Sequence, residues 1–329
     1  MLGGRLLNAA IVGIAGPSLS REEAALLRAH PPAGVILFAR NIQSPDQLCA
    51  LIANLRRILP PEAVLVIDQE GGRVARLRPP YWRAHPAARA VGAAGLRAAW
   101  LTGALIGLDC RAAGFDVVTA PVLDLPIVGA HAVIGDRAFA TEAGSVARLG
   151  RAFAAGLLAA GIQPVAKHAP GHGRALVDSH LLLPRVGTDQ LDADLLPFAL
   201  NTDVPWAMSA HIVYAAWDAA LPATLSPTVI KTIIRDRIGF EGVLVTDDLA
   251  MHALTGKPAD LARQALAAGC DVALYCSGEF APTAELLQIC PKLTEAATAR
   301  LAAARSLAQR RRLPLDAAAL AAERDRLLA

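Results

Sequence analysis

Residues 144–168, GSVARLGRAFAAGLLAAGIQPVAKH, decide the fold class. Up to Gly161, apolar side chains recur at the three- and four-residue spacing of a helix that buries one face. Gly161 stands where a glycine commonly ends a helix, and residues 164–168 then form a short apolar run that ends in Lys167 and His168. A helix that returns directly to a continuous apolar strand is typical of a parallel sheet covered on both faces.

The same alternation of strand and helix extends along the whole chain. Ser44 and Ser226 are N-cap candidates for two of the helices, and Gly239 is a further helix-ending glycine. Eight strand–helix units predict an α/β fold, a single (β/α)8 TIM-type barrel closed by right-handed crossovers. A doubly wound open sheet is the alternative. The strand-like runs occupy residues 9–15, 34–38, 63–68, 115–123, 164–168, 206–211, 242–247 and 271–275.

One domain over residues 1–329 is expected, because the chain shows no linker, composition shift or low-complexity block. A barrel commonly exceeds about 250 residues as one unit. The helical tail from about residue 294 is too simple to form a second domain. The N-terminal twenty residues contain a short apolar run without a clear cleavage site, so a first core strand is expected there rather than a signal peptide.

Composition argues against other classes of protein. The most apolar stretch, residues 98–114, contains Asp109 and Arg111, so we expect a buried helix and no membrane partner. Five scattered cysteines without Cys-x-x-Cys spacing indicate a reducing cytoplasm and no structural zinc. The net charge of +3 is nearly balanced, and the basic cluster 310–312 lies at a helix end, so no nucleic-acid partner is expected.

Ionisable side chains collect where the apolar runs end. In a barrel these ends meet at the C-terminal rim, where active sites are built. The pattern therefore predicts an enzyme with a polar cup at one end. The residues are Arg40, Asp68 to Arg76, Asp124, Lys167 to His180, His211, Asp247 and Asp248.

The segment 167–180 carries the most unusual spacing. His168 and His172 are four apart, as in a zinc-binding helix, but Pro170 and the glycines beside it argue against a helix. A long loop is predicted instead, and such loops are commonly functional. Within it, Asp178 and His180 would share one side of an extended segment, so that the carboxylate orients the imidazole as a general acid/base.

Two other segments offer carboxylates. Asp68, followed by Gly71-Gly72, is expected to precede a tight turn from which Arg73 and Arg76 reach back. Asp247 and Asp248 end the seventh strand, where alternation places them on opposite faces without saying which one enters the cup.

Together these segments resemble glycoside hydrolase family 3, and within it the short bacterial β-N-acetylhexosaminidase branch. The matching pieces follow the family order over nearly the whole chain. They are GVILFARNI (34–42), IDQEGGRVARL (67–77), APVLDL (120–125), VIGDRAF (133–139), KHAPGHG with DSH and LP (167–184), MSAHIVY (208–214) and TDDLAM (246–251).

The resemblance implies a role for each matching residue. Asp247 matches the nucleophile of a retaining glycosidase, and His180, oriented by Asp178, matches the acid/base. The substrate would be a terminal β-linked N-acetylglucosamine, released from small anhydro-muropeptides in cytoplasmic cell-wall recycling. The sugar would be held by Asp68, Arg76, Arg137, Lys167 and His168, with His172, His211 and Asp124 as supporting residues.

No cofactor or metal is expected, and the protein is expected to be a monomer. The chain departs from the family pattern at Arg174 and Ala175, which puts the packing of the loop in doubt. A family 3 β-glucosidase is one alternative, although its acid/base usually comes from a second domain. A metal-dependent barrel hydrolase with His168, His211 and Asp247 as ligands is the other.

Overall fold

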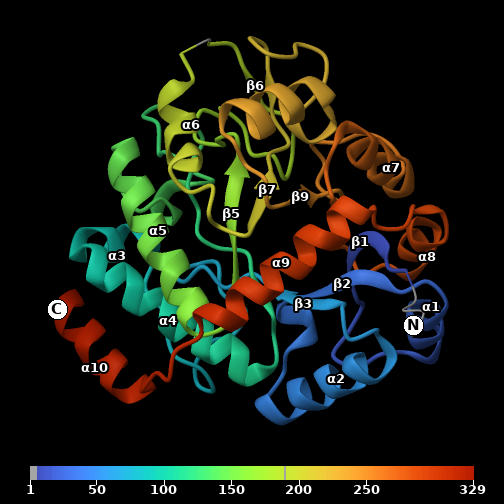
Figure 1. The fold of residues 1–329 in the computed structure, drawn as a ribbon, viewed down its shortest axis with the longest axis horizontal. Helices are drawn as coiled ribbons and strands as arrows, with labels where there is room; N and C mark the ends of the chain where they lie inside the picture. The colour runs from blue at the N-terminus through green and yellow to red at the C-terminus, as the bar shows by residue number, and fades with distance from the viewer. Residues whose placement is uncertain (1–5, 189) are drawn as a thin grey trace.

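The computed structural model describes residues 6–188 and 190–329. In this part of the chain, eight strands pair in parallel and close into a barrel in the order β1-β10-β9-β7-β5-β4-β3-β2 (Figure 1). The closed barrel confirms the predicted (β/α)8 architecture over an open sheet. Its strands are β1 (Asn8–Gly13), β2 (Pro32–Leu37), β3 (Val64–Ile67), β4 (Val117–Val118), β5 (Gln163–Ala169), β7 (Trp206–Ser209), β9 (Val243–Asp248) and β10 (Val272–Tyr275).

Each predicted strand run overlaps an observed strand, and the run 115–123 differs most. Its regular part is only β4, because beyond it Ala120 N donates to the Val118 carbonyl of its own segment rather than to a neighbouring strand. The chain beyond it stays attached to β5 at single points: the Pro121 carbonyl accepts from Lys167 N at 3.1 Å, and Leu123 N donates to Lys167 O at 2.7 Å. This irregular stretch leads into the loop whose residues 131–134 line the cavity at the mouth of the barrel.

Helices return the chain between most of the strands. The predicted caps are present: the Ser44 hydroxyl accepts from Gln47 N, and the Ser226 hydroxyl accepts from Val229 N. Gly161 and Gly239 follow their helices with φ of 84° and 78°. The helices are α1 (Arg21–Ala29), α2 (Pro45–Ile58), α3 (Ala88–Ala94), α4 (Leu96–Ala113), α5 (Ala143–Ala159), α6 (Asp192–Ala199), the π-helix Val229–Arg237, α7 (Pro258–Ala268), α8 (Phe280–Ile289), α9 (Glu295–Arg311) and α10 (Ala317–Leu328), with short 3-10 turns at Ala39–Asn41, Gly135–Arg137 and Ala223–Leu225 and a small parallel ladder of β6 (Arg185–Val186) with β8 (Val213–Tyr214).

The apolar stretch 98–114 forms most of α4, which packs on α5 at very short range. A Cβ atom at Gly103 would lie 2.1 Å from the Phe153 carbonyl oxygen, and one at Gly156 would lie 2.1 Å from that of Trp100. The small residues therefore allow the two backbones to touch, which explains the glycine and alanine content of both helices. Within the described residues, no helix combines the length and apolar character needed to span a membrane.

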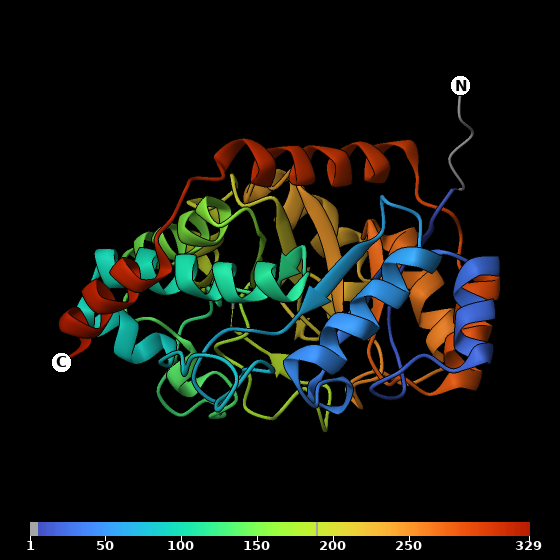
Figure 2. The ribbon, with the colours of Figure 1, turned by 90° about the horizontal axis from the view of Figure 1, so that it is seen from below.

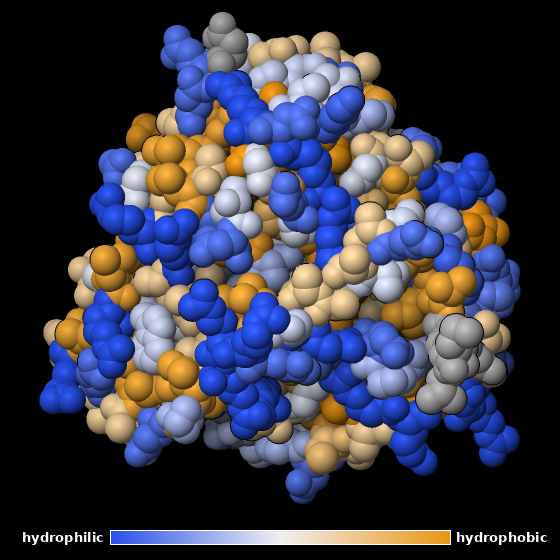
Figure 3. All heavy atoms as spheres, viewed as in Figure 1, coloured by the Kyte–Doolittle hydropathy of each residue, from blue (hydrophilic) through white to orange (hydrophobic). Residues whose placement is uncertain are grey.

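The predicted helical tail closes the end of the barrel at which the strands begin. In α9, Arg300 donates to the Glu241 carbonyl at 2.9 Å and pairs with Asp271 at 2.7 Å, just ahead of β9 and β10. Figure 2 shows α9 along one end of the barrel, with the loops that follow the strands at the other. The face that α9 crosses mixes hydrophilic and hydrophobic residues (Figure 3). Helix α10 packs Leu320 against Leu101 of α4. The open end is therefore the C-terminal rim.

Candidate active site

A cavity of about 530 Å³ opens at the C-terminal rim. Nearly all the residues predicted for the site line it, whereas Asp124 and His211 lie behind its wall and bond to residues of the cup. The predicted residues in the lining are Asp68, Arg76, Arg137, Lys167, His168, His172, Asp178, His180 and Asp247, together with Glu70, Ser179 and Asp248.

Asp247 and Asp248, at the end of β9, both border the cavity but differ in their surroundings. Asp248 faces the wall, where its Oδ1 accepts from Ala250 N and Cys276 N, both at 2.9 Å. Burial raises the pKa of Asp248. Burial acts on Asp247 in the same direction, but attraction by His168 and His211 outweighs it and lowers the pKa of Asp247. Of the two carboxylates, Asp247 is therefore the one whose surroundings favour the ionised form that a nucleophile requires.

His168 is held from behind by Asp124. The Asp124 side chain is fully buried and contacts His168 Nδ1 at 2.6 Å, and it accepts from the backbone N–H of His168 as well. Because Nδ1 carries the proton shared with the carboxylate, Nε2 is the nitrogen left to face the cup. Burial opposes ionisation of Asp124, but the two nearby histidines lower its pKa to about 2. Asp124 thus fixes the orientation of His168.

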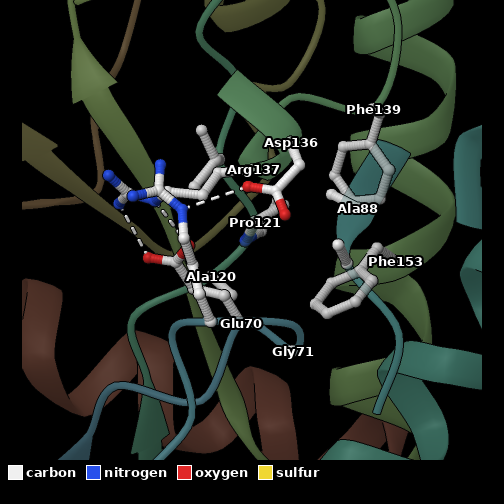
Figure 4. Close-up of a pocket in the computed structure, with 12 residues that line it drawn as sticks. Glu70, Gly71, Ala88, Ala120, Pro121, Asp136, Arg137, Phe139 and Phe153 are labelled. Atoms are coloured by element: carbon white, nitrogen blue, oxygen red, sulfur yellow. Dashed lines mark hydrogen bonds and ion pairs between the residues drawn. The ribbon is translucent and has the colours of Figure 1, made fainter. Parts of the chain in front are cut away.

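A network of ion pairs at the cavity wall depends on a residue that the motif analysis did not assign, Glu70. Its carboxylate accepts two bonds of 2.8 Å from Arg137 and lies 2.6 Å from Lys167 Nζ. Burial would raise the pKa of Glu70, but the two cations lower it to about 2. Figure 4 shows Glu70 and Arg137 on one side of a small recess, with the rings of Phe139 and Phe153 on the other. In the sequence, the feature that points to Glu70 is its place directly before Gly71-Gly72.

The turn after Asp68 has the predicted shape, with one correction. Gly71 and Gly72 adopt φ of 101° and 55°, and a Cβ atom at Gly71 would lie 2.4 Å from the Pro86 carbonyl oxygen. Arg76 reaches back to Asp68 at 2.9 Å, as expected. Arg73 does not: it extends to Asp136 and the carbonyl oxygens of the 132–134 loop, because the turn projects it toward the rim.

Asp178 and His180 meet at the mouth of the cup, but not as an extended segment. The Asp178 carbonyl accepts from Leu181 N and Leu182 N, so the pair lies in a turn. One carboxylate oxygen of Asp178 accepts from His180 N at 2.9 Å and contacts His180 Nδ1 at 2.7 Å. The His180 side chain is 61% exposed. The extended geometry was wrong because Asp178 bonds the backbone two residues on, as turn-forming aspartates do, yet the turn still brings the carboxylate to the imidazole.

The unusual Arg174 and Ala175 have defined places at the start of this loop. Arg174 Nε donates to Asp194 of α6 at 2.7 Å, and Ala175 is buried with its carbonyl accepting from His131 N at 2.9 Å. Glycine at 171 packs against Asp194, where a Cβ atom would come within 2.9 Å. The departure from the family pattern therefore gives this loop an ion pair to α6.

His211 is not arranged as a metal ligand. Its Nδ1 contacts the Thr224 hydroxyl at 2.8 Å and its Nε2 contacts the Asp248 carbonyl at 3.0 Å, so both ring nitrogens have protein partners. Among the described residues, no group of three or more His, Cys, Asp or Glu side chains is placed to hold a metal ion. The proposed set of His168, His211 and Asp247 thus lacks support from the geometry.

Comparison with known proteins matches the chain to one family. The model of the glycosyl hydrolase family 3 N-terminal domain matches residues 5–309. The chain belongs to glycoside hydrolase family 3. A protein named beta-hexosaminidase from Methylococcus capsulatus is 43% identical over 303 residues, covering 88% of this chain and 89% of the relative. Another beta-hexosaminidase, from Alkalilimnicola ehrlichii, is 42% identical over 287 residues, covering 83% and 81%.

A solved structure has the same architecture over almost its whole length. NagZ from Neisseria gonorrhoeae, in complex with N-trifluoroacetyl-D-glucosamine, superposes with a TM-score of 0.86 at 33% identity, covering 98% of this chain and 99% of that one. The predicted family, and the prediction of a glycoside hydrolase with it, are confirmed.

The buried carboxylates of this family 3 barrel predict a loss of stability in acid. Glu70 and Asp124 have pKa values of about 2 in the folded protein, below their ordinary values of 4.5 and 3.8. Their contribution is therefore complete above about pH 4.5 and is lost as the pH falls toward about 2. We expect the free energy of urea unfolding to fall over this interval, and to fall less steeply in Asp124→Asn. Equal slopes in the two proteins would contradict this assignment.

Proposed function

We propose that the protein is a β-N-acetylhexosaminidase that hydrolyses terminal, non-reducing β-linked N-acetylglucosamine with retention of configuration. One observation carries this proposal: Asp247, a carboxylate with a lowered pKa at the end of β9, lines the same cavity as the His180–Asp178 pair at the mouth. A retaining glycosidase needs an ionised nucleophile at the anomeric carbon and a proton donor at the leaving oxygen. The names of the curated relatives support the choice of sugar.

The chemistry assigned to these groups has two steps. Asp247 attacks the anomeric carbon while His180 gives a proton to the departing oxygen, leaving a glycosyl ester on Asp247. His180 then takes a proton from water as the water displaces Asp247. Because Asp178 holds the Nδ1 proton of His180, Nε2 is the nitrogen that exchanges protons with substrate and water. Exposure of His180 suits a group that must meet the leaving group at the mouth.

The sugar itself would be held deeper in the cup. Arg76, Arg137 and Lys167 present cationic donors to sugar hydroxyls, and Asp68 presents an acceptor. Arg76 pairs with Asp68, and Arg137 and Lys167 pair with Glu70, so these groups are held in place before substrate arrives. Such preorganisation reduces the entropic cost of binding. His168 faces the same region with Asp124 behind it, while His172 and His211 support the loop and the end of β9.

We further propose that the whole chain is one catalytic domain acting as a monomer on muropeptides in cytoplasmic cell-wall recycling. Two observations support the short, single-barrel form: NagZ matches this chain over 99% of its own length, and the proposed acid/base lies within the barrel's own loop. A family 3 β-glucosidase is the alternative, and the choice between them rests on the 2-acetamido group of the substrate.

The test is turnover of aryl β-N-acetylglucosaminide and of the matching aryl β-glucoside, with the anomer formed first followed by NMR. We expect activity on the former, much weaker activity on the latter, and initial release of the β-anomer. Full activity is expected in EDTA. Preference for the glucoside, or initial release of the α-anomer, would contradict the proposal, and loss of activity in EDTA would favour a metal-dependent hydrolase.

A further inference from the structure

A continuous series of hydrogen bonds connects the floor of the cup to the proposed acid/base at its mouth. It begins at His168, whose ring contacts Asp124 at 2.6 Å. The other oxygen of Asp124 accepts from the backbone N–H of His172 at 2.7 Å. The His172 ring then contacts the Ser179 hydroxyl at 2.8 Å through Nε2. Ser179 lies between the two members of the dyad, Asp178 and His180, so the series ends at the acid/base.

Ser179 faces inward while the dyad around it faces the mouth. Its exposed fraction is 2%, against 61% for the side chain of His180. The turn is closed by the bonds from Leu181 N and Leu182 N to the Asp178 carbonyl, which tie residues 178–182 to one another. The inward-facing hydroxyl of this turn, that of Ser179, is hydrogen-bonded to the buried His172. This bond attaches the turn to the interior of the cup.

The partner of Ser179 is buried and is held through its backbone N–H by Asp124, while its ring Nδ1 has no hydrogen-bond partner in the described structure. His172 is 2% exposed, and its ring packs edge-on against that of His168 with centroids 5.4 Å apart. Burial and the neighbouring His168 lower the pKa of His172 to about 4, so the ring is neutral near pH 7. A neutral ring offers one donor and one acceptor nitrogen, and either arrangement pairs with a hydroxyl. His172 therefore gives the turn a fixed point tied to the wall that faces the sugar.

The opposite side of the turn has a weaker attachment. His252 N donates to the His180 carbonyl at 3.3 Å, longer than the Ser179 bond and made to an exposed segment. The exposed leucines at 181 and 182 add little buried area. The side chain of Ser179 is thus the strongest polar attachment from the 178–182 turn to the interior among the bonds the structure describes.

We propose that Ser179 is a positioning residue for the acid/base: through His172 it sets the orientation of the Asp178–His180 pair and couples it to the sugar-facing pair Asp124–His168. This inference rests on the proposed function, because it takes His180 as the proton donor. It predicts that loss of the hydroxyl impairs proton donation without removing the nucleophile or the sugar site.

Leaving groups of different acidity separate these effects. A dinitrophenolate departs without a proton, whereas an alkoxide needs one, and kcat/KM reports only the first step, the formation of the glycosyl-enzyme. For Ser179→Ala we expect kcat/KM on a methyl β-N-acetylglucosaminide to fall by about tenfold to a hundredfold, the effect of a misplaced group. On the dinitrophenyl glycoside it should stay within about threefold, because no acid is needed there.

Three further variants make the test decisive. Ser179→Thr keeps the hydroxyl and should recover most of the methyl glycoside activity, and Leu182→Ala, in the same turn, should resemble the wild type on both substrates. His180→Ala should show the same selectivity as Ser179→Ala, but larger. An equal loss on both substrates, or no loss, in Ser179→Ala would overturn the role of Ser179 while His180→Ala remains selective. If His180→Ala is itself unselective, the proposed acid/base is overturned as well.

Discussion

Replacing Asp247 with alanine is expected to lower hydrolysis of an aryl β-N-acetylglucosaminide by roughly 10⁴-fold or more, as for other lost nucleophiles. The reason is the charge state of the site. Asp247 is partly buried, and attraction by His168, His211 and Lys167 lowers its pKa against the opposing effect of desolvation. Without Asp247, His168, His211 and Lys167 no longer surround a carboxylate. The other carboxylate at the end of β9, Asp248, has a raised pKa. Initial rates of aryl alcohol release measure the effect directly.

The matched control is the neighbouring carboxylate. Asp248→Asn keeps an acceptor for Ala250 N and Cys276 N, so the wall of the barrel should be retained. Because the role of Asp248 is to satisfy these backbone donors, we expect a loss within about tenfold. If Asp248→Asn were as inactive as Asp247→Ala, or if Asp247→Ala kept substantial activity, the assignment of the nucleophile would be wrong.

Replacing Glu70 with alanine is expected to cost about 3–5 kcal/mol in the free energy of unfolding, the usual penalty for breaking a buried ion pair. The carboxylate is 6% exposed and balances two cations, Arg137 and Lys167. Once it is removed, Arg137 loses this paired carboxylate and Lys167 keeps only the longer contact of 3.6 Å with Asp68, so both cations are freer to move from the positions proposed to hold the sugar. We therefore expect a raised KM in addition to the loss of stability.

An exposed ion pair provides the control for Glu70. Asp136 pairs with Arg73, and both side chains are about half exposed. Such pairs contribute little, so Asp136→Ala should change the free energy of unfolding by less than about 1 kcal/mol. Urea unfolding of the three proteins tests the comparison. Similar stabilities for Glu70→Ala and Asp136→Ala would show that the buried network is not a stabilising feature.

The barrel was predictable from the sequence because its signals are local. Strand β5 is a short apolar run after an amphipathic helix, and Gly161 follows that helix with a positive φ, at the place where a helix-ending glycine was predicted. The length of β4 was not predictable in the same way. Its run is apolar apart from Asp116 and Thr119, and only the pairing with β3 and β5 shows that the ladder is interrupted near Pro121.

The site was predictable in its location more than in its connections. Asp68, Lys167 and Asp247 gather in one cup because parallel strands end at one rim, as expected. The role of Glu70 depends on Arg137, far away in the chain, and the anchoring of Arg174 depends on Asp194. Such pairs are set by tertiary packing, which no local pattern encodes.

The local sequence does not distinguish the roles of Asp247 and Asp248 either. Alternation along a strand predicts opposite faces but cannot assign them. In the structure both residues border the cavity, and the difference lies in their partners: Asp248 is bonded to two backbone N–H groups, whereas Asp247 lies near His168 and His211. The family resemblance favours Asp247, and the charged and polar groups around it give the physical reason.

The central claim is a covalent glycosyl-enzyme on Asp247, and trapping it is the most direct test. In His180→Ala, a dinitrophenyl β-N-acetylglucosaminide should still form the intermediate, while its hydrolysis is slowed because the base is missing. Mass spectrometry of the intact protein should then show the addition of one N-acetylglucosaminyl group, and peptide mapping should place it on Asp247. An adduct on Asp248, or turnover of this substrate with inversion and no adduct, would contradict the account.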